Sequence, residues 1–222
     1  MPAPARALIF DFDGLILDTE VAIYEAWREL YEAHGFPLTL ETWAQCVGSD
    51  FGHYNPESDL ERMLGRTLDW EPLVQQRRRR VAEVLEGSDA MPGVRERLRE
   101  AKEHGIPCAV ASSSSHHWVD GWLERLGLAE AFVSTTCLED IGRAKPDPGL
   151  FLHAAASLNA APGETIVLED SLNGLRAAHA AKMRCVVVPC VVTQHLTFHG
   201  AWRQLRSLED ITVPELVGAA TP

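Results

Sequence analysis

The sequence predicts an α/β protein, in which a doubly wound, Rossmann-like parallel sheet core carries an inserted α-helical cap domain. Two observations predict this fold. Short apolar runs alternate with longer amphipathic stretches over most of the chain, as expected when helices connect the parallel strands of one sheet. The alternation stops at residues 19–89, where helical patterns follow one another without a strand pattern.

Five apolar runs are candidate strands, because they are apolar or β-branched almost throughout, as strands buried on both faces are. They lie at residues 7–11, 106–111, 131–134, 165–168 and 184–188. Helical patterns separate the later runs, at residues 94–104, 118–126, 149–158 and 172–181. Gly105 and Gly127 directly follow the first two of these patterns, and glycine is a common residue at helix ends.

The helical insertion is predicted to form a domain of its own. Its helical patterns lie at residues 21–34, 40–47, 58–64 and 71–85. We therefore expect a core domain of residues 1–18 and 90–222 and a cap domain of residues 19–89. Four consecutive arginines, residues 77–80, wrap around one helical turn of the cap. In an acidic protein we expect this run to be a solvated helix face rather than a nucleic-acid site.

Composition excludes several classes of protein. The 222 residues are 46% apolar and 23% charged, which is typical of a folded globular chain. A net charge of −12 disfavours general binding to nucleic acid or anionic membranes. No apolar run is long enough to span a bilayer, and acidic residues interrupt the N-terminal stretch where a signal peptide would be apolar. With five scattered cysteines, we expect free thiols in a cytoplasmic monomer that has no nucleic-acid or membrane partner.

Carboxylates follow two of the predicted strands. Asp11 and Asp13 close the first strand, where a period of two places them on the same side of the chain. Glu169 and Asp170 close the fourth. Ligands of open α/β sheets bind at this carboxyl edge. Each pair also has a simpler interpretation, since Asp-Gly is common in turns and Asp170 precedes a helix that it would cap.

A hydroxyl cluster and a cation complete the predicted edge. Serines occupy residues 112–115 after the second strand, at the start of a helix, where they would cap the helix or bind an anion. Lys145, one of three lysines in the chain, lies in a proline-rich loop. Carboxylates suit Mg²⁺, and lysine, hydroxyls and amides suit phosphate. Together these residues predict a site for a divalent metal and a phosphoryl group.

The same residues resemble the four motifs of the haloacid dehalogenase superfamily. They are Asp11-Phe12-Asp13-Gly14-Leu15, Ser112, Lys145-Pro146-Asp147-Pro148 and Leu168-Glu169-Asp170-Ser171. The segment Asp13-Gly14-Leu15-Ile16-Leu17-Asp18-Thr19-Glu20 is similar to the subgroup with a small helical cap, which includes β-phosphoglucomutase. The resemblance covers the whole chain, with the motifs in the same order and at matching spacing.

The resemblance implies a role for each acidic residue. Asp11 would be the nucleophile, which attacks phosphorus and forms an aspartyl-phosphate that water hydrolyses. Asp13 would be the general acid for the leaving alcohol and then the general base for the water. Mg²⁺ would be held by the Asp11 carboxylate, the backbone carbonyl of Asp13 and the Asp170 carboxylate. Glu169 would assist directly or through a water molecule.

The resemblance also implies how the phosphoryl group is held. Ser112 and Lys145 would bind it, with backbone amides near Gly14 and Ser113 contributing. Such transfer depends mostly on positioning and on neutralising charge. We therefore expect a Mg²⁺-dependent phosphatase whose partner is a small phosphorylated metabolite, such as a sugar phosphate.

Two alternatives remain beside the phosphatase. Haloacid dehalogenases lack the second aspartate, and phosphonoacetaldehyde hydrolases need a cap lysine, whereas this chain has Asp13 and no lysine in residues 19–90. A β-phosphoglucomutase-like phosphotransferase is harder to separate, although Ile23 stands where that enzyme has a histidine and the cap lysine is missing. A non-catalytic module that binds a phosphorylated ligand is a weaker alternative, because every catalytic position is filled.

Substrate selectivity is expected to lie in the cap. Residues 46–53 resemble the family's specificity loop by position. The nearby aromatic side chains, those of Trp43, His53 and Tyr54, are candidates for substrate contact, but packing between cap helices is the stronger expectation for each. His116 and His117 follow the serines, and we expect them to lie on a helix surface.

Overall fold

A parallel sheet forms the centre of the computed structural model, which describes residues 4–44, 47 and 54–218. In these residues the sheet has six strands in the order β3-β2-β1-β4-β5-β6, and every neighbouring pair is parallel. The strands are β1 (Ala7–Phe10), β2 (Cys108–Ala111), β3 (Ser134–Thr136), β4 (Thr165–Glu169), β5 (Arg184–Val187) and β6 (Arg203–Gln204). The predicted fold class is confirmed.

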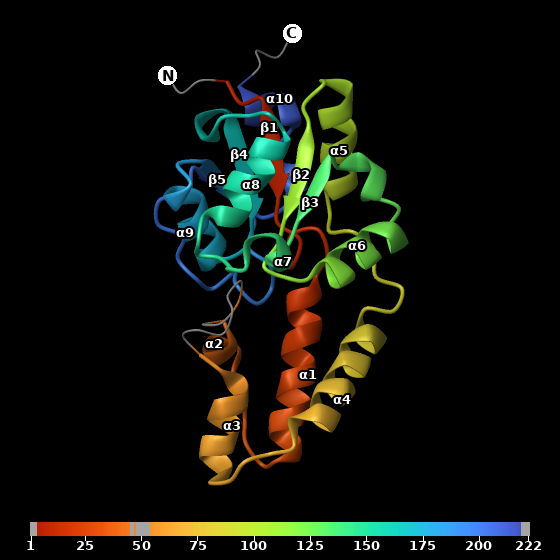
Figure 1. The fold of residues 1–222 in the computed structure, drawn as a ribbon, viewed down its shortest axis with the longest axis vertical. Coiled ribbons are helices and arrows are strands. Elements are labelled where there is room, and N and C mark those ends of the chain that lie inside the picture. Colours follow the sequence, from red (N-terminus) through yellow and green to blue (C-terminus); the bar gives the residue numbers. More distant parts are fainter. Residues whose placement is uncertain (1–3, 45–46, 48–53, 219–222) are drawn as a thin grey trace.

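Helices cover both faces of the sheet, so that it is doubly wound (Figure 1). One face packs against α5 (Val94–Glu103), α6 (His116–Arg125) and α10 (Val213–Val217), and the other against α8 (Gly149–Ser157) and α9 (Leu172–Ala180). Successive residues of β1 alternate between these layers, since Leu8 and Phe10 lie in one apolar cluster and Ala7 and Ile9 in the other.

One predicted strand is misplaced. A strand is predicted at residues 131–134, of which the first three are apolar, but β3 begins only at Ser134, because a 3₁₀ turn occupies Ala129–Ala131. Phe132 packs its ring at 5.7 Å from the ring of Phe10, so its apolar character reflects core packing outside the strand. The short helix α7 (Leu138–Ile141) follows β3 and leads into the loop that carries Lys145.

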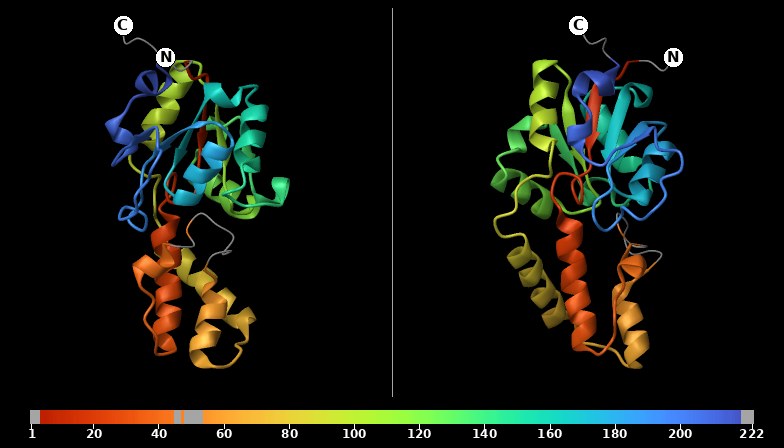
Figure 2. Two further views of the ribbon diagram at one scale, coloured as in Figure 1. Left: turned by 90° about the vertical axis from the view of Figure 1, so that its left-hand side faces the viewer. Right: turned by 180° about the vertical axis from the view of Figure 1, so that it is seen from behind.

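The chain between β1 and α5 forms a helical unit, α1–α4, and the described part of it contains no strand. Its helices are α1 (Thr19–Ala33), α2 (Leu40–Trp43), α3 (Pro56–Leu64) and α4 (Trp70–Val84). Figures 1 and 2 show the unit beyond the carboxyl ends of the strands, with α1 and α4 packed side by side. Trp27, Trp43 and Leu60 are buried in an apolar cluster that this unit shares with Cys190 and Val192 of the remaining chain. The domain boundaries at residues 18 and 90 stay a prediction.

The thiol prediction holds where the structure describes it, since Cys108, Cys137, Cys185 and Cys190 are free and buried. Cys46 lies outside the described residues. In the described part of the chain, no helix combines the length and the apolar character that crossing a membrane requires.

Candidate active site

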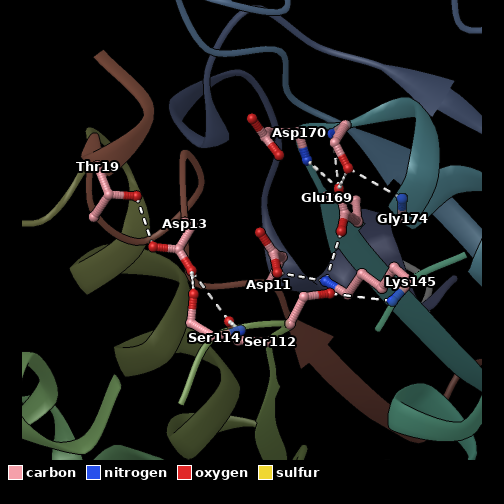
Figure 3. Close-up of polar contacts among 11 residues, drawn as sticks. Asp11, Asp13, Thr19, Ser112, Ser114, Lys145, Glu169, Asp170 and Gly174 are labelled. Atoms are coloured by element: carbon pink, nitrogen blue, oxygen red, sulfur yellow. Dashed lines mark hydrogen bonds and ion pairs between the residues drawn. The ribbon is translucent and has the colours of Figure 1, made fainter. Parts of the chain in front are cut away.

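The order of the strands brings the predicted residues to one edge of the sheet. β1 lies between β2 and β4, and the carboxyl ends of all three meet there. Asp11 follows β1, and its amide still bonds the Leu168 carbonyl of β4 at 2.9 Å. Ser112 follows β2, and Asp170 follows β4. Figure 3 shows Asp11 between Asp13 and Lys145, with Ser112 beside Asp13.

Three buried carboxylates form an acidic cluster. Asp11, Glu169 and Asp170 each offer an oxygen, and these oxygens lie within 4.8 Å of one another. Burial raises the pKa of Asp11, although the charge of Lys145 opposes the shift. Burial and the charge of Glu169 raise the pKa of Asp170 well above its ordinary range. Like charges brought together in a dry site disfavour ionisation unless a cation neutralises them.

The acidic cluster fits a divalent cation. Asp170 Oδ2 is buried and has no hydrogen-bond partner among the described residues. Such an oxygen is costly unless something else satisfies it. Gly14 keeps the space beside it open, since a Cβ at this position would lie 2.4 Å from the same oxygen. Carboxylate oxygens are the ligands that Mg²⁺ prefers in proteins.

Lys145 supplies a fixed positive charge to the cluster. Its side chain is 1% exposed, and Nζ donates to an oxygen of Asp11 and, at 2.7 Å, to Glu169 Oε1. Burial lowers the pKa of this amine, but the two carboxylates outweigh burial and raise it. Lys145 is therefore protonated at neutral pH. A charged group held in place before the substrate arrives is what phosphoryl transfer requires.

Glu169 has a role that the sequence analysis did not identify. Oε1 accepts from Lys145, and Oε2 accepts from the amides of Asp170 (2.8 Å) and Ser171 (2.7 Å) and from the Ser171 hydroxyl. Both oxygens are thus engaged, and the side chain orients the lysine and the turn after β4. Gly174 makes room for it, because a Cβ there would lie 1.8 Å from Glu169 Cδ.

Asp13 lies apart from the acidic cluster. Oδ1 accepts from the Thr19 hydroxyl at 2.7 Å and from the Trp118 indole at 2.9 Å. Oδ2 accepts from the hydroxyls of Ser112 at 3.1 Å and Ser114 at 2.6 Å. Figure 3 shows this carboxylate directed toward Thr19 and the serines, whereas Asp11 faces Lys145. The sequence analysis missed Thr19 and Trp118 as partners, and no local pattern in the sequence links Trp118 to a residue so distant in the chain.

The residues expected to hold phosphate differ in their contacts. Ser112 is 1% exposed, and its hydroxyl oxygen accepts from the Ser114 amide at 2.9 Å. The Ser113 hydroxyl oxygen accepts from the Lys145 amide at 3.1 Å, which ties the serine loop to the lysine loop. The amide of Gly14 donates to the Leu17 carbonyl at 2.8 Å, so in this structure it closes a turn. The glycine is needed there because its φ is +81°.

The described aromatic residues of the helical unit pack against one another, as the packing interpretation predicts. Trp43 is 2% exposed and lies 6.1 Å from the ring of Trp27. The Tyr54 hydroxyl bonds Asp59 at 3.1 Å. His53 and the specificity loop, apart from Val47, lie outside the described residues.

His116 and His117 lie on the surface of α6, as predicted, whereas Arg77 departs from its predicted role. His116 bonds Asp120 at 2.9 Å and Asp140 at 2.8 Å, so from the helix surface it also joins α6 to α7. The arginine run is not a uniformly solvated face, because the Arg77 guanidinium lies 3.5 Å from the centroid of the Trp27 ring. Burial lowers its pKa to about 10. The packing of α4 against α1 turns one side of the arginine run inward.

A cavity of about 650 Å³ lies between the start of α6 and the helical unit. Its lining is mixed. Ile23 and Val81 are apolar, Arg77 and Arg78 are cationic, and the serines and Trp118 contribute from the side of the sheet. A chamber with both kinds of lining beside Asp13 suits a small polar molecule.

The chain matches a known family over most of its length. The model of the haloacid dehalogenase-like hydrolases matches residues 8–188. "Putative phosphatase YhcW" of Bacillus subtilis (strain 168) is 42% identical over 212 residues, and the match covers 96% of each chain. Hexitol phosphatase B of Escherichia coli (strain K12) is 32% identical, with 98% of this chain and 99% of the relative covered.

A solved structure agrees with these relatives. CbbY from Rhodobacter sphaeroides, in a complex with xylulose-(1,5)bisphosphate, has a TM-score of 0.73 and 28% identity, and the match covers 92% of this chain and 95% of that chain. The family model, the relatives aligned over nearly their full length and the solved structure lead to the same assignment. The chain belongs to the haloacid dehalogenase-like hydrolases, within their β-phosphoglucomutase-like subgroup.

Proposed function

We propose that this enzyme is a Mg²⁺-dependent phosphatase, which hydrolyses the phosphomonoester of a small phosphorylated carbohydrate through an aspartyl-phosphate intermediate. One observation carries the proposal: a buried Lys145 holds the Asp11 carboxylate beside the open oxygen of Asp170, while Asp13 lies apart with its own donors. The phosphatase activity is supported by the family and by the name of Hexitol phosphatase B, and that name also supports a carbohydrate substrate.

The reaction has two steps. A carboxylate oxygen of Asp11 attacks phosphorus, the bond from phosphorus to the substrate oxygen breaks, and Asp13 gives a proton to the leaving alcohol. Water then attacks the phosphorus of the aspartyl-phosphate, Asp13 takes its proton, and the Asp11 carboxylate is released. Lys145 and Ser112 hold the phosphoryl oxygens throughout.

The cation has its place in the acidic cluster. Asp11 and Asp170 would hold Mg²⁺ with the backbone carbonyl of Asp13, and the ion supplies positive charge against the phosphoryl oxygens. Glu169 is engaged through both oxygens, so we assign it the orientation of Lys145. Water-mediated assistance by Glu169 is compatible with this arrangement.

The helical unit is proposed to act as the cap domain, residues 19–89. The substrate's carbon chain would occupy the cavity between α6 and α1–α4, where hydroxyls meet the serines and arginines. Closure of the unit would exclude bulk water from the aspartyl-phosphate. Ile23 lines this cavity. Its side chain cannot donate or accept a proton, which favours hydrolysis over a mutase reaction that needs a histidine at this position.

Phosphate release from a panel of phosphorylated carbohydrates tests the proposal. The panel contains hexitol phosphates and β-glucose-1-phosphate, with Mg²⁺ or with EDTA. We expect release that requires Mg²⁺ and is lost in Asp11→Asn. Asp69→Asn is the matched control, because Asp69 makes no side-chain cap bond at the start of α4.

Two outcomes contradict the proposal. Formation of glucose-6-phosphate without free phosphate would assign a mutase. Release that survives in Asp11→Asn would exclude the aspartyl-phosphate.

A further inference from the structure

Trp118 reaches from α6 to the loop after β1. It is the third residue of the helix and is partly buried, and its ring meets that of Trp122 edge-on with 5.9 Å between the centroids. Its indole Nε1 donates to Asp13 Oδ1 at 2.9 Å. The side chain therefore joins the helix that follows the serine loop to the acid/base of the proposed reaction.

The two oxygens of Asp13 have different kinds of partner. Thr19 and Trp118 bond Oδ1, and Ser112 and Ser114 bond Oδ2. A hydroxyl is able to donate or accept, but an indole N–H only donates. The hydroxyls beside Oδ2 can therefore turn when that oxygen gains a proton, whereas Oδ1 must remain an acceptor for as long as the indole bond exists.

We propose that Trp118 is a positioning residue for Asp13, whose indole N–H anchors Oδ1 so that Oδ2 exchanges the proton with the substrate. Oδ2 is the oxygen next to Ser112, the residue to which the proposed function assigns the binding of the phosphoryl group. The anchor fixes the rotation of the carboxyl group and so keeps the same oxygen toward the reacting bond. This inference rests on the proposed function, because it assumes that Asp13 is the acid and base.

The leaving group of the substrate makes the inference testable. The ratio kcat/KM covers the steps up to departure of the leaving group. An alkyl phosphate needs a proton from Asp13 at that step, but p-nitrophenyl phosphate does not, because p-nitrophenolate leaves without one. A defect in positioning the acid therefore affects alkyl phosphates selectively, while a general loss of structure affects both substrates.

Trp118→Phe is the central variant, since it keeps an aromatic ring and removes the N–H. We expect kcat/KM for a hexitol phosphate to fall about 10-fold, with a change of less than about 2-fold for p-nitrophenyl phosphate. Most of the loss should be in kcat. Trp118→His retains an N–H two bonds from the ring attachment, as in the indole, and should recover part of the alkyl activity.

Two further variants separate the possible failures. Trp122→Phe is the matched control on the same helix and should change neither ratio. Asp13→Asn should lower kcat/KM for the hexitol phosphate by about 100-fold or more, with a much smaller effect on p-nitrophenyl phosphate. If Asp13→Asn is not selective, the acid role in the proposed function is wrong. If it is selective but Trp118→Phe lowers both ratios equally, or lowers neither, the positioning role is wrong.

Discussion

The strand edge and the helical unit treat their buried polar groups differently. At the strand edge, Lys145 is held by two carboxylates and Asp13 by four donors. In the helical unit, Trp27 Nε1 and Arg77 Nε are buried without a hydrogen-bond partner in the described part of the chain, and aromatic packing surrounds them. Hydrogen bonds and ion pairs thus hold the polar groups of the edge, apart from Asp170 Oδ2, whereas aromatic rings surround the two unpartnered nitrogens of the unit. Catalysis needs polar groups that hydrogen bonds hold in place. Aromatic packing is compatible with adaptation to a substrate.

Of the predicted changes, removal of the Lys145 charge from the strand edge should have the largest effect. We expect Lys145→Met to lower kcat/KM by about 10³-fold, because three buried carboxylates lose their fixed counter-charge and the phosphoryl group loses its proposed ligand. Steady-state phosphate release measures the loss. Lys102→Met, at an exposed position of α5, is the control and should keep full activity. A loss of less than about 10-fold in Lys145→Met would mean that the edge does not depend on this charge.

A methyl group added at Gly174 tests how rigidly the strand edge is packed. Gly174→Ala should lower the free energy of unfolding by about 3 kcal/mol, because the new Cβ would lie 1.8 Å from Glu169 Cδ and nothing can move without disturbing Lys145. Urea unfolding gives the value. Gly163→Ala is the matched variant, since no atom lies within 4 Å of its added Cβ and its φ needs no glycine. Equal stability of the two variants would show that the edge relaxes as easily as a loop.

Arg77 offers the corresponding test in the helical unit. Arg77→Met should raise KM for a carbohydrate phosphate about 10-fold while kcat changes little, because Arg77 lines the cavity but is not part of the acidic cluster. Initial rates over a range of substrate concentrations separate the two constants. Arg79→Met, exposed on the same helix, should change neither. A fall in kcat alone would assign Arg77 to the packing of α1 against α4.

The smallest predicted effect concerns His116, which joins α6 to α7. Burial lowers its pKa, but Asp120 and Asp140 outweigh burial and raise it above the ordinary value of 6.5. The protonated form therefore stabilises the fold below pH 6.5, and this contribution disappears as the pH rises through the folded-state pKa. We expect His116→Gln to cost about 0.5 kcal/mol at pH 5.5 and less at pH 9, by urea unfolding. A cost that grows with pH would contradict the ion pairs.

Sequence alone was informative where a strand end fixes a side chain. Because parallel neighbours end at one edge, the sequence predicts that Asp11, Asp170 and Ser112 share that edge; Asp11 and Asp170 do lie in one cluster, and Ser112 bonds Asp13 after the same strand as Asp11. The engagement of Glu169 by four donors was not predictable, because it depends on the turn after β4 and on the space at Gly174. The bond from Trp118 to Asp13 joins residues that have no local relation in the chain.

The errors in the fold have local causes. The apolar run at residues 131–134 predicts a strand, but an apolar side chain can also pack into the core from a turn, as that of Phe132 does. The two-residue strand β6 is exposed, so it leaves no apolar pattern in the sequence. Arg77 was predicted to be solvated because periodicity within α4 does not reveal that α1 presents Trp27 to it.

The central position of β1 has a consequence for biosynthesis. β1 is made before the helical unit, its partner β2 follows that unit, and its other partner β4 begins only at Thr165. Until both partners have been made, the apolar β1 segment lacks a complete set of neighbours, and such exposed apolar segments make nascent chains prone to aggregation. Glu169, the second carboxylate that holds Lys145, joins the site only when β4 has been made. A phosphate ligand would therefore stabilise the finished sheet and no earlier folding stage.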